Sequence, residues 1–320
     1  MSYTIKPFHT DYIDDATALL ATNYARAQCA EPNLPALELL GNGQGAATFR
    51  LNLEKDAHRP GFAAFQNGQL CAFMLETMRF SWKGQQVVAS EEMSHAARVE
   101  DRAMLYRLLY RELAHRWVSE GRHLHIVNYL AHETSLTECL YLLGFGAILA
   151  QEIRDVSSSG PTDEFEIVEN PSPAALLELQ REHSGYYATS PIFLRRNDSD
   201  AEIVSELEEH LADGDRIFSC ISNGQQIALF IVGESAADGE GLLLRRTNSA
   251  QLKSAYIRPT ERRRGLGAAL LERSISWTRQ QGYDRLFVEH ETANLSGSAF
   301  WGKYFKPFVY VTMRYVDNSL

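Results

Sequence analysis

Hydrophobic positions recur with two different periods along the second half of the chain. Residues 216–222 and 226–232 alternate in the manner of strands, and Asn223-Gly224 between them is a strong signal for a two-residue hairpin turn. Residues 266–281 instead repeat apolar side chains at steps of three and four, which predicts an amphipathic helix. Gly282 directly after it is typical of a residue that ends a helix in a left-handed conformation.

The first half of the chain repeats this order of elements. Asn67-Gly68 again separates two strand-like segments, 61–66 and 69–75, and Gly121 again follows a helical pattern. The further elements that the first half predicts are strands at 3–6, 123–129 and 148–155 and helices at 13–23 and 103–119; those of the second half are strands at 164–169 and 285–290 and a helix at 173–183. The two halves therefore predict two α/β domains in tandem.

The boundary between the halves is a short polar segment. Residues 157–163 combine serine, glycine and proline and show no hydrophobic period, so they are the best candidate for a linker. The predicted domains are thus residues 1–156 and 164–320.

Composition narrows the class of protein. The chain has 320 residues, of which 45% are hydrophobic, enough for two domains with cores of their own. A formal net charge of −10 argues against a nucleic-acid partner, which requires a basic surface. The cysteines have no paired spacing, so neither disulfides nor a metal site are expected. No apolar run approaches a membrane span and the start lacks a signal-peptide core, so the expected compartment is the cytoplasm.

The most specific chemical signal is the segment 255–268. A strand-like run meets Pro259, an arginine- and glycine-rich turn comes next, and the predicted helix begins. A helix that starts at such a turn directs free amide groups and its positive dipole end at a ligand, as a pyrophosphate site requires. The order Arg262-x-x-Gly265-x-Gly267 lacks the lysine of a Walker loop and the third glycine of a dinucleotide fingerprint.

This segment and the elements after it resemble the GNAT acetyltransferase superfamily. After the helix come a strand, then Asn294, then the aromatic pair Phe300-Trp301 and a final strand-forming segment, 307–314, in the order of a GNAT domain. The resemblance is strong in the second half and faint in the first. It implies the fold class α/β, with two tandem GNAT-like domains, each a mixed, mostly antiparallel sheet flanked by helices.

The resemblance also implies acetyl-CoA as co-substrate. It assigns the pantetheine arm to backbone groups of the strand before the loop, and the pyrophosphate to amides of the loop. Asn294 lies where family members often touch the coenzyme, although it is equally a candidate helix cap. The residues so assigned are Ala255, Tyr256, Ile257, Arg262, Arg263, Arg264, Gly265, Leu266, Gly267, Ala268 and Asn294.

Acetyl transfer to an amine requires a base for the amine and a proton for the leaving thiolate. Glu289, at the end of a predicted strand, is the first candidate for the base, and His290 and Glu291 have the same access. The family's usual acid is a tyrosine where this chain has Trp301, whose indole cannot give up a proton. Tyr304, one helical turn later, is the candidate that remains, and packing is its alternative role.

The first half departs from the coenzyme pattern. If Gly121 is set against Gly282, then Met104 and Tyr106 replace the two loop glycines and Asp101 brings negative charge to the place of a pyrophosphate. The negative charge of Asp101 would repel the negatively charged pyrophosphate. We therefore expect the first half not to bind acetyl-CoA and to have a structural role.

The predicted function is acetyl transfer from acetyl-CoA to an amine, on a small molecule. Residues 185–191 form the loop expected to line the acceptor pocket, and the acidic segment 198–209 would attract a cationic amine. Three alternatives stay open: acetylation of a protein or peptide amine, a non-catalytic acyl-CoA-binding or scaffold protein, and aminoacyl transfer from charged tRNA. The acidic balance and the intact loop speak against the last.

Overall fold

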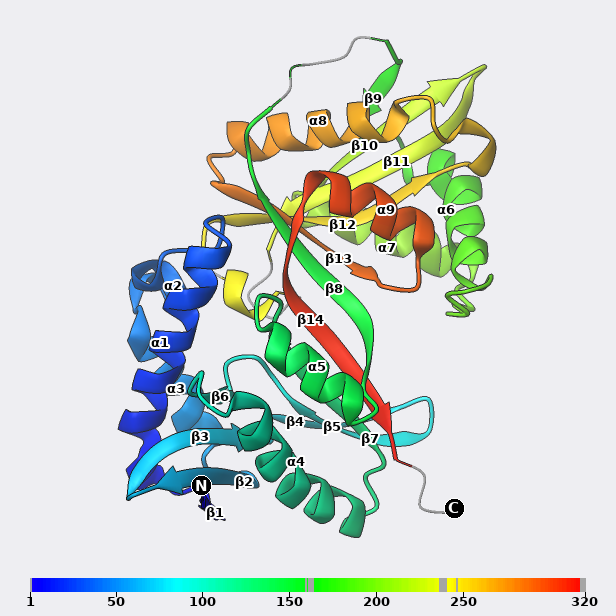
Figure 1. The fold of residues 1–320 in the computed structure, drawn as a ribbon. Coiled ribbons are helices and arrows are strands. Elements are labelled where there is room, and N and C mark those ends of the chain that lie inside the picture. Colours follow the sequence, from blue (N-terminus) through cyan, green and yellow to red (C-terminus); the bar gives the residue numbers. More distant parts are fainter. Residues whose placement is uncertain (1, 159, 161–163, 236–240, 246, 317–320) are drawn as a thin grey trace. The chain divides into compact units, whose positions relative to one another are not determined.

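The computed structural model describes residues 2–158, 160, 164–235, 241–245 and 247–316. The chain divides into two compact units, Met1–Gln151 with Lys306–Leu320, and Glu152–Phe305 (Figure 1). We call them unit 1 and unit 2 and describe each by itself. Part of the predicted linker, residues 159 and 161–163, lies outside the described residues.

Unit 1 contains two groups of strands. Its elements are β1 (Thr4–Pro7), α1 (Ile13–Ala30), α2 (Leu40–Gly43), α3 (Ala46–Asp56), β2 (Gly61–Gln66), β3 (Gln69–Leu75), β4 (Met78–Trp82), β5 (Gln85–Ser90), β6 (His95–Ala97), α4 (Arg102–Ser119), β7 (Leu124–Leu130), α5 (Thr134–Leu142), the first part of β8 (Gly146–Asp155) and β14 (Lys306–Tyr315). The strand orders are β1-β2-β3-β6 and β4-β5-β7-β14-β8. Only the β5–β7 pairing is parallel among the registers described in this unit.

Unit 2 is a mixed sheet with helices on both faces. It is built from the end of β8, β9 (Ile167–Glu169), α6 (Pro173–Tyr187), α7 (Asp200–Ala212), β10 (Arg216–Ser222), β11 (Gln225–Glu234), β12 (Ser249–Ile257), α8 (Leu266–Gln280), β13 (Arg285–Glu291) and α9 (Leu295–Tyr304). The strand order is β8-β13-β12-β11-β10-β9. The described β12–β13 pairing is parallel and the others are antiparallel.

The turn signals of the sequence are confirmed. Asn67 and Gly68 between β2 and β3, and Asn223 and Gly224 between β10 and β11, all have positive φ, as tight hairpin turns require. Gly282 after α8 has φ +84°, the left-handed stop that its position predicts.

Two clusters form the core of unit 2, one on each face of the sheet. The cluster under α8 and α9 includes Leu270, Ile275 and Trp301 with side chains of β11, β12 and β13. The cluster under α6 and α7 includes Leu176 and Leu207 with side chains of β10 and β11. The central strands between them are buried on both sides, so the sheet is a fixed frame for the loops at its ends.

The final strand predicted at 307–314 is β14, Lys306–Tyr315. β14 pairs antiparallel with β7 of unit 1, from Val309 opposite Leu130 to Tyr315 opposite Leu124. Its neighbour on the other side is β8. The chain thus enters unit 2 within β8 and leaves it between α9 and β14. The last strand of the sequence therefore completes the sheet of unit 1.

Candidate active site

A bulge in β12 changes which of its side chains face α8. Lys253 is the extra residue, because Leu252 and Ser254 pair with consecutive residues of β11. Leu252 lies in the cluster under α8, whereas Tyr256 lies in the cluster under α6. An inserted residue reverses the alternation of a strand. After the bulge, the side chains that pack toward α8 are those of Ala255 and Ile257.

The bulge is held by a buried ion pair. The Lys253 ammonium lies 2.8 and 2.9 Å from the two carboxylate oxygens of Asp215, which is 1% exposed. His210 Nδ1 lies 2.7 Å from the same carboxylate. Gly233 leaves room for it, since a Cβ there would stand 1.6 Å from Asp215 Oδ1. The distortion of β12 is therefore built into the core.

The parallel ladder between β12 and β13 ends at the bulge. It joins Ser249–Leu252 to Arg285–Val288, and the described register goes no further. Beyond it, backbone groups of Lys253–Ile257 on this edge of β12 need partners other than β13. A bound chain that adds hydrogen bonds like a strand is one such partner. This is the segment to which the sequence assigns the pantetheine arm.

The arginine- and glycine-rich loop leads directly into α8 at this end of the strand. Gly265 has φ +91° and Arg263 has φ +63°, and the helix begins at Leu266. The amide of Ala269 is bonded to the Gly265 carbonyl at 3.0 Å. The amides of residues 266–268 come before Ala269, the first amide that donates within the helix, and point out of the helix end. The geometry is that of an anion site.

The two loop glycines are needed for different reasons. Gly265 requires its conformation, since a Cβ there would meet only Phe165 at 3.7 Å. Gly267 is buried, and its Cβ would lie 2.8 Å from Phe300 Cε2 and 3.3 Å from Ile257 Cδ1. The second glycine therefore serves the close packing of α8 against α9.

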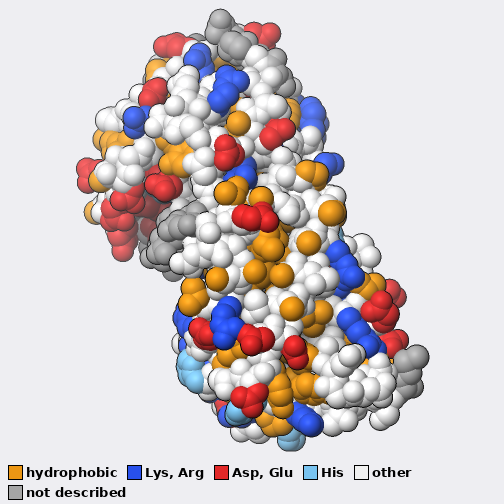
Figure 2. Space-filling view, turned by 90° about the vertical axis from the view of Figure 1, so that its left-hand side faces the viewer, with side chains coloured by type: hydrophobic (Ala, Val, Ile, Leu, Met, Phe, Trp, Pro, Cys, Tyr) orange, Lys and Arg blue, Asp and Glu red, His pale blue; other side chains and the backbone are white. Residues whose placement is uncertain are grey.

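The three arginines of the loop have different surroundings. Arg262 donates through Nε to the Ile257 carbonyl at 3.1 Å, and its guanidinium lies 4.7 Å from the ring centre of Tyr186. Arg264 forms an ion pair with Glu261. Arg263 is exposed. On the face shown in Figure 2, basic side chains are scattered among acidic ones.

Asn294 is the cap of α9. Its Oδ1 accepts the Gly297 amide at 3.0 Å and the Tyr186 hydroxyl at 2.8 Å. Of the two roles that the sequence leaves open, capping is confirmed. The coenzyme contact stays a prediction.

The segment expected to be the acceptor loop is in part helical. The sequence placed residues 185–191 in a loop, but α6 continues through Tyr187, so that expectation is wrong for residues 185–187. A helix whose sequence has no stop signal continues as long as its apolar face is buried. The helix carries Tyr186 to Asn294 and Tyr187 to Glu291. Burial and the hydrogen-bonded Glu291 carboxylate together raise the pKa of Tyr187 well above its usual range.

Glu289 lies half-buried on β13, one residue past the end of the ladder. Leu286 and Val288 face α8, so alternation directs Glu289 and Glu291 toward the α6 face. The contact of Glu291 with Tyr187 of α6 agrees with this. The role of Glu289 as base stays a prediction.

Trp301 is a core residue. It is 6% exposed, and its ring centre lies 5.7 Å from that of Phe230 and 5.6 Å from that of Phe305. Tyr304 is half-buried with its ring 5.0 Å from Phe300. Tyr304 therefore packs against Phe300, which is the alternative role that the sequence offers. Its role as an acid stays a prediction.

The comparisons with known proteins agree with this geometry. Residues 177–305, which contain α8, both strands of the opened ladder and α9, match the model of the acetyltransferase (GNAT) family. Residues 177–305 are thus similar to the GNAT family. Among curated proteins, none matches the chain.

Solved structures extend the likeness over both units. A GCN5-related N-acetyltransferase from Sphaerobacter thermophilus is 11% identical with a TM-score of 0.57, covering 99% of this chain and 97% of its own. The glucosamine N-acetyltransferase region of a fungal multi-domain GH3 β-N-acetylglucosaminidase is 13% identical with a TM-score of 0.55, covering 98% and 38%. A tandem GNAT protein of clavulanic acid biosynthesis, 10% identical, covers 100% of both chains with a TM-score of 0.47. The predicted fold class, two tandem GNAT-like α/β domains, is confirmed.

Unit 1 has different residues at the corresponding place. The helix α4 is three residues longer than α8, with 18 residues against 15, so an alignment from Gly121 is wrong at the other end. Asp101, with φ +57°, precedes α4 as Gly265 precedes α8. The residue after it, Arg102, is buried and lies 3.1 Å from Glu133, the residue before α5. An acidic side chain and a buried ion pair thus occupy the helix end.

A histidine joins the two strand groups of unit 1. His95 Nε2 lies 2.7 Å from the Asn128 carbonyl, so it carries the proton, and Nδ1 accepts the Tyr106 hydroxyl at 2.8 Å. Burial lowers the pKa of His95 to about 4. The expectation that unit 1 holds no coenzyme stays a prediction.

One contact of the GNAT domain was missed by the sequence. His290 Nε2 lies 3.2 Å from Oε1 of Glu152, on β8, and both side chains are buried. The signal available was weak: a Gln-Glu pair inside the otherwise apolar segment 148–153. Pairing of β8 beside β13 could not be deduced from it.

Neither a metal centre nor a membrane span is found in the described part of the chain. Within those residues, no group of three or more histidine, cysteine, aspartate or glutamate side chains is arranged to hold a metal ion. Over the same residues, every helix is too short or too polar to cross a membrane.

Proposed function

We propose that unit 2 binds acetyl-CoA and transfers its acetyl group to an amine of a small molecule. Members of the GNAT family are N-acetyltransferases. The observation that carries the proposal is the juxtaposition of two features at one end of the sheet. The free amides at the start of α8 adjoin the part of β12 that has separated from β13.

The coenzyme would be held mainly by backbone groups. The amides of Leu266–Ala268, with the helix dipole, would bind the pyrophosphate. The edge of β12 from Ala255 to Ile257 would pair with the amides of the pantetheine arm. Arg263 and Arg264 would add positive charge, while Arg262 and Asn294 would hold the loop and α9 in place through their contacts with Tyr186.

The acetyl group would be transferred by direct attack of the amine on the thioester carbonyl. Glu289 is the proposed base that takes the proton from the amine, directly or through a water. The amide of Ile257 is the proposed donor to the oxyanion. The carbon–sulfur bond then breaks, and the CoA thiolate takes up a proton.

The acceptor side supports a small, cationic amine. Tyr186, Tyr187 and Glu291 converge there from α6 and β13. The paired aromatic rings offer a flat apolar wall, and the carboxylate offers a counter-charge. One of the structures with the same fold is described as a glucosamine N-acetyltransferase, an enzyme for a small amine.

Calorimetric titration of acetyl-CoA tests the coenzyme site. Ala268 is the third residue of α8, where a glutamate is favourable for the helix but brings a negative charge to the proposed pyrophosphate. We expect one site per wild-type chain, binding that is abolished in Ala268→Glu, and binding that is retained, though weaker, in the isosteric Ala268→Gln.

Turnover is then measured as release of free thiol with a panel of small amines and lysine peptides. Thiol release that depends on a small amine supports the proposal, and release that depends only on peptides supports the protein-acetylating alternative. Acetyl-CoA binding without release for any acceptor would favour the non-catalytic alternative. Equal binding in Ala268→Glu and Ala268→Gln would contradict the site.

A further inference from the structure

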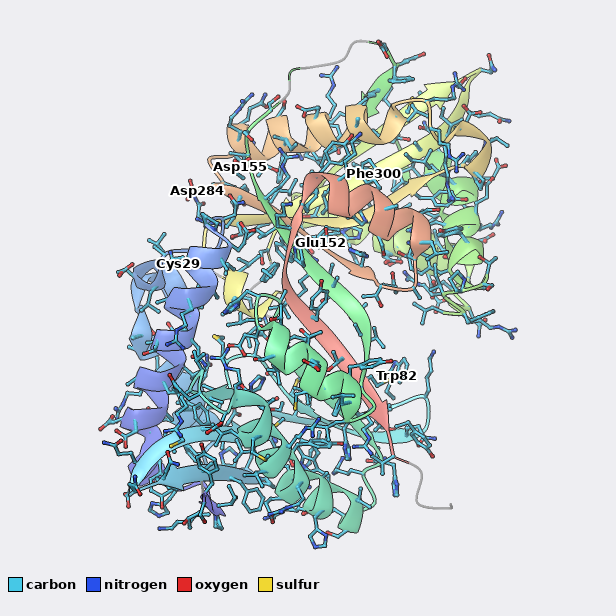
Figure 3. All side chains as sticks on the ribbon, in the orientation of Figure 1. Cys29, Trp82, Glu152, Asp155, Asp284 and Phe300 are labelled. Atoms are coloured by element: carbon cyan, nitrogen blue, oxygen red, sulfur yellow. The ribbon has the colours of Figure 1, made fainter. Side chains whose placement is uncertain are left out.

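The buried pair His290–Glu152 lies outside the roles proposed so far. His290 is 5% and Glu152 is 7% exposed, and their side chains meet at 3.2 Å. They lie 138 residues apart in the sequence, on the neighbouring strands β13 and β8. Figure 3 labels Glu152 on β8 and Phe300 on α9.

The hydrogen-bond partners of His290 indicate where the protons of its ring lie. His290 Nδ1 lies 3.2 Å from the Glu291 carbonyl oxygen, which only accepts, so Nδ1 carries a proton. Nε2 faces Oε1 of Glu152, and a bond between these two atoms needs a second proton. That proton lies between the imidazole and the carboxyl group, and the ionised form of the pair is an imidazolium held by a carboxylate.

The second carboxylate oxygen of Glu152 adds an independent observation. Oε2 is buried and has no hydrogen-bond partner among the residues that the structure describes. A buried acceptor without a partner destabilises the folded state. A fold that retains this oxygen beside a buried histidine–glutamate pair gains little stability from them. The arrangement is better explained by a ligand that donates to, or accepts from, the pair.

The position of the pair matches the leaving group of the proposed reaction. His290 is two residues beyond Val288, the last residue of the β12–β13 ladder. Alternation places it on the face of Leu286 and Val288, which is the face of α8 and α9. The thiol end of a coenzyme that starts at α8 and runs along β12 would reach this end of the opened ladder. On α9, the indole of Trp301 can donate a hydrogen bond but cannot give up its proton to a thiolate.

We propose that His290 is the catalytic residue that protonates the leaving CoA thiolate, with Glu152 as the residue that positions it and keeps it charged. The inference rests on the proposed acetyl transfer. As the carbon–sulfur bond breaks, sulfur keeps the electron pair and takes the Nε2 or Nδ1 proton, leaving CoA thiol, the amide product and a neutral imidazole. The proton removed from the amine returns to the pair through solvent before the next turnover.

Other titratable groups lie on the same elements and enter the interpretation of any pH profile. They are Glu289 and Glu291 on β13, Arg154 and Asp155 on β8, and Lys303 and Tyr304 on α9. Arg154 lies with its guanidinium 5.8 Å from the Phe305 ring, and burial lowers its pKa. Single substitutions that leave these groups in place therefore isolate His290.

The first test reads the charge of His290 without any turnover. The protein is labelled with ¹⁵N-histidine, and His290→Gln assigns the signal at pH 7.5, where an ordinary histidine is about 90% neutral. We expect both ring nitrogens of His290 to be protonated in the wild type, and one to lose its proton in Glu152→Gln. A neutral His290 in the wild type would overturn the proposal.

The second test separates catalysis from binding. We expect His290→Gln to lower kcat about a hundredfold while the Kd for acetyl-CoA stays within about twofold. Glu152→Gln should lower kcat less and shift the alkaline limb of the kcat profile to lower pH. His115→Gln, an exposed histidine of unit 1, is the matched control and should match the wild type.

Imidazole provides the decisive readout. His290→Ala with added imidazole should recover part of the lost kcat, because the added base carries the proton, and a structural role would give no recovery. Wild-type turnover in His290→Gln, or loss of turnover in Tyr304→Phe alone, would overturn the inference. Loss of acetyl-CoA binding in the wild type would instead refute the proposed function, and the charge measurement would still decide whether the pair exists.

Discussion

Gly265→Ala tests whether the conformation of one loop residue governs coenzyme binding. Gly265 has φ +91°, and an added Cβ would meet only Phe165 at an ordinary 3.7 Å. The cost is therefore backbone strain without a clash, about 1–2 kcal/mol for a residue with a side chain. Gly282, at the other end of α8, has φ +84° with nothing within 4 Å of its Cβ position. Gly282→Ala is thus a control with the same strain.

The two substitutions should lower stability alike and binding differently. If the loop relaxes to relieve the strain, the amides of residues 266–268 turn away from the phosphate. Each charge-assisted hydrogen bond so lost is worth about 1.5–3 kcal/mol, or roughly 10- to 150-fold in Kd. We expect Gly265→Ala to weaken acetyl-CoA binding by at least about tenfold, and Gly282→Ala to leave the Kd unchanged.

Urea denaturation gives the free energy of unfolding, and calorimetry gives the Kd for acetyl-CoA. The reasoning is refuted if Gly265→Ala loses stability but binds acetyl-CoA like the wild type, since the strained turn would then have no part in the site. It is equally refuted if Gly282→Ala weakens binding as much, because a general loosening of α8 would explain both.

Three further predictions concern packing, capping and pH. Gly267→Ala should destabilise unit 2 by about 1–3 kcal/mol, because the added Cβ displaces Phe300. Adding Phe300→Leu should recover part of this loss in urea denaturation. If the effects of the two substitutions were additive, the contact would be contradicted. Asn294→Ala should cost about 1 kcal/mol, because α9 loses its cap, whereas a change below about 0.3 kcal/mol would show the cap to be unimportant. Since the folded pKa of His95 is about 4 and that of an unfolded histidine about 6.5, the unfolded chain binds the proton first, and stability should fall as pH drops from about 6.5 to 4, by up to about 1.4 kcal/mol per pH unit. His95→Gln should reduce the slope by this amount without abolishing it, because burial also lowers the pKa of His125, His132 and His183 to about 4, and an unchanged slope would refute the assignment.

The sequence by itself determined the features that depend on neighbouring residues. The hairpins at Asn67-Gly68 and Asn223-Gly224, the start of α8 at Gly265 and its end at Gly282 all arise from local conformational preference. The same local signals, taken in order, predicted the tandem fold and the family of the second half. They also predicted the anion site, which stays a prediction, because a helix end and its amides are adjacent in the chain.

Only the tertiary structure decided the features that depend on distant pairing. The bulge at Lys253 reverses the faces of Ala255 and Tyr256, and it is held by Asp215 of another strand end. No hydrophobic period reveals an inserted residue, because a strand with a bulge still alternates on either side of it.

The pairing of β8 and β14 is the largest feature that depends on distant segments. Both segments read as strands in the sequence, but their neighbours, β13 for the end of β8 and β7 for β14, are chosen by which sheet edge each can complete. Strand pairing depends on backbone groups that every residue has, so it leaves no signature in residue type. For that reason the sequence showed His290 as one candidate among several, and only the folded sheet brought Glu152 to it.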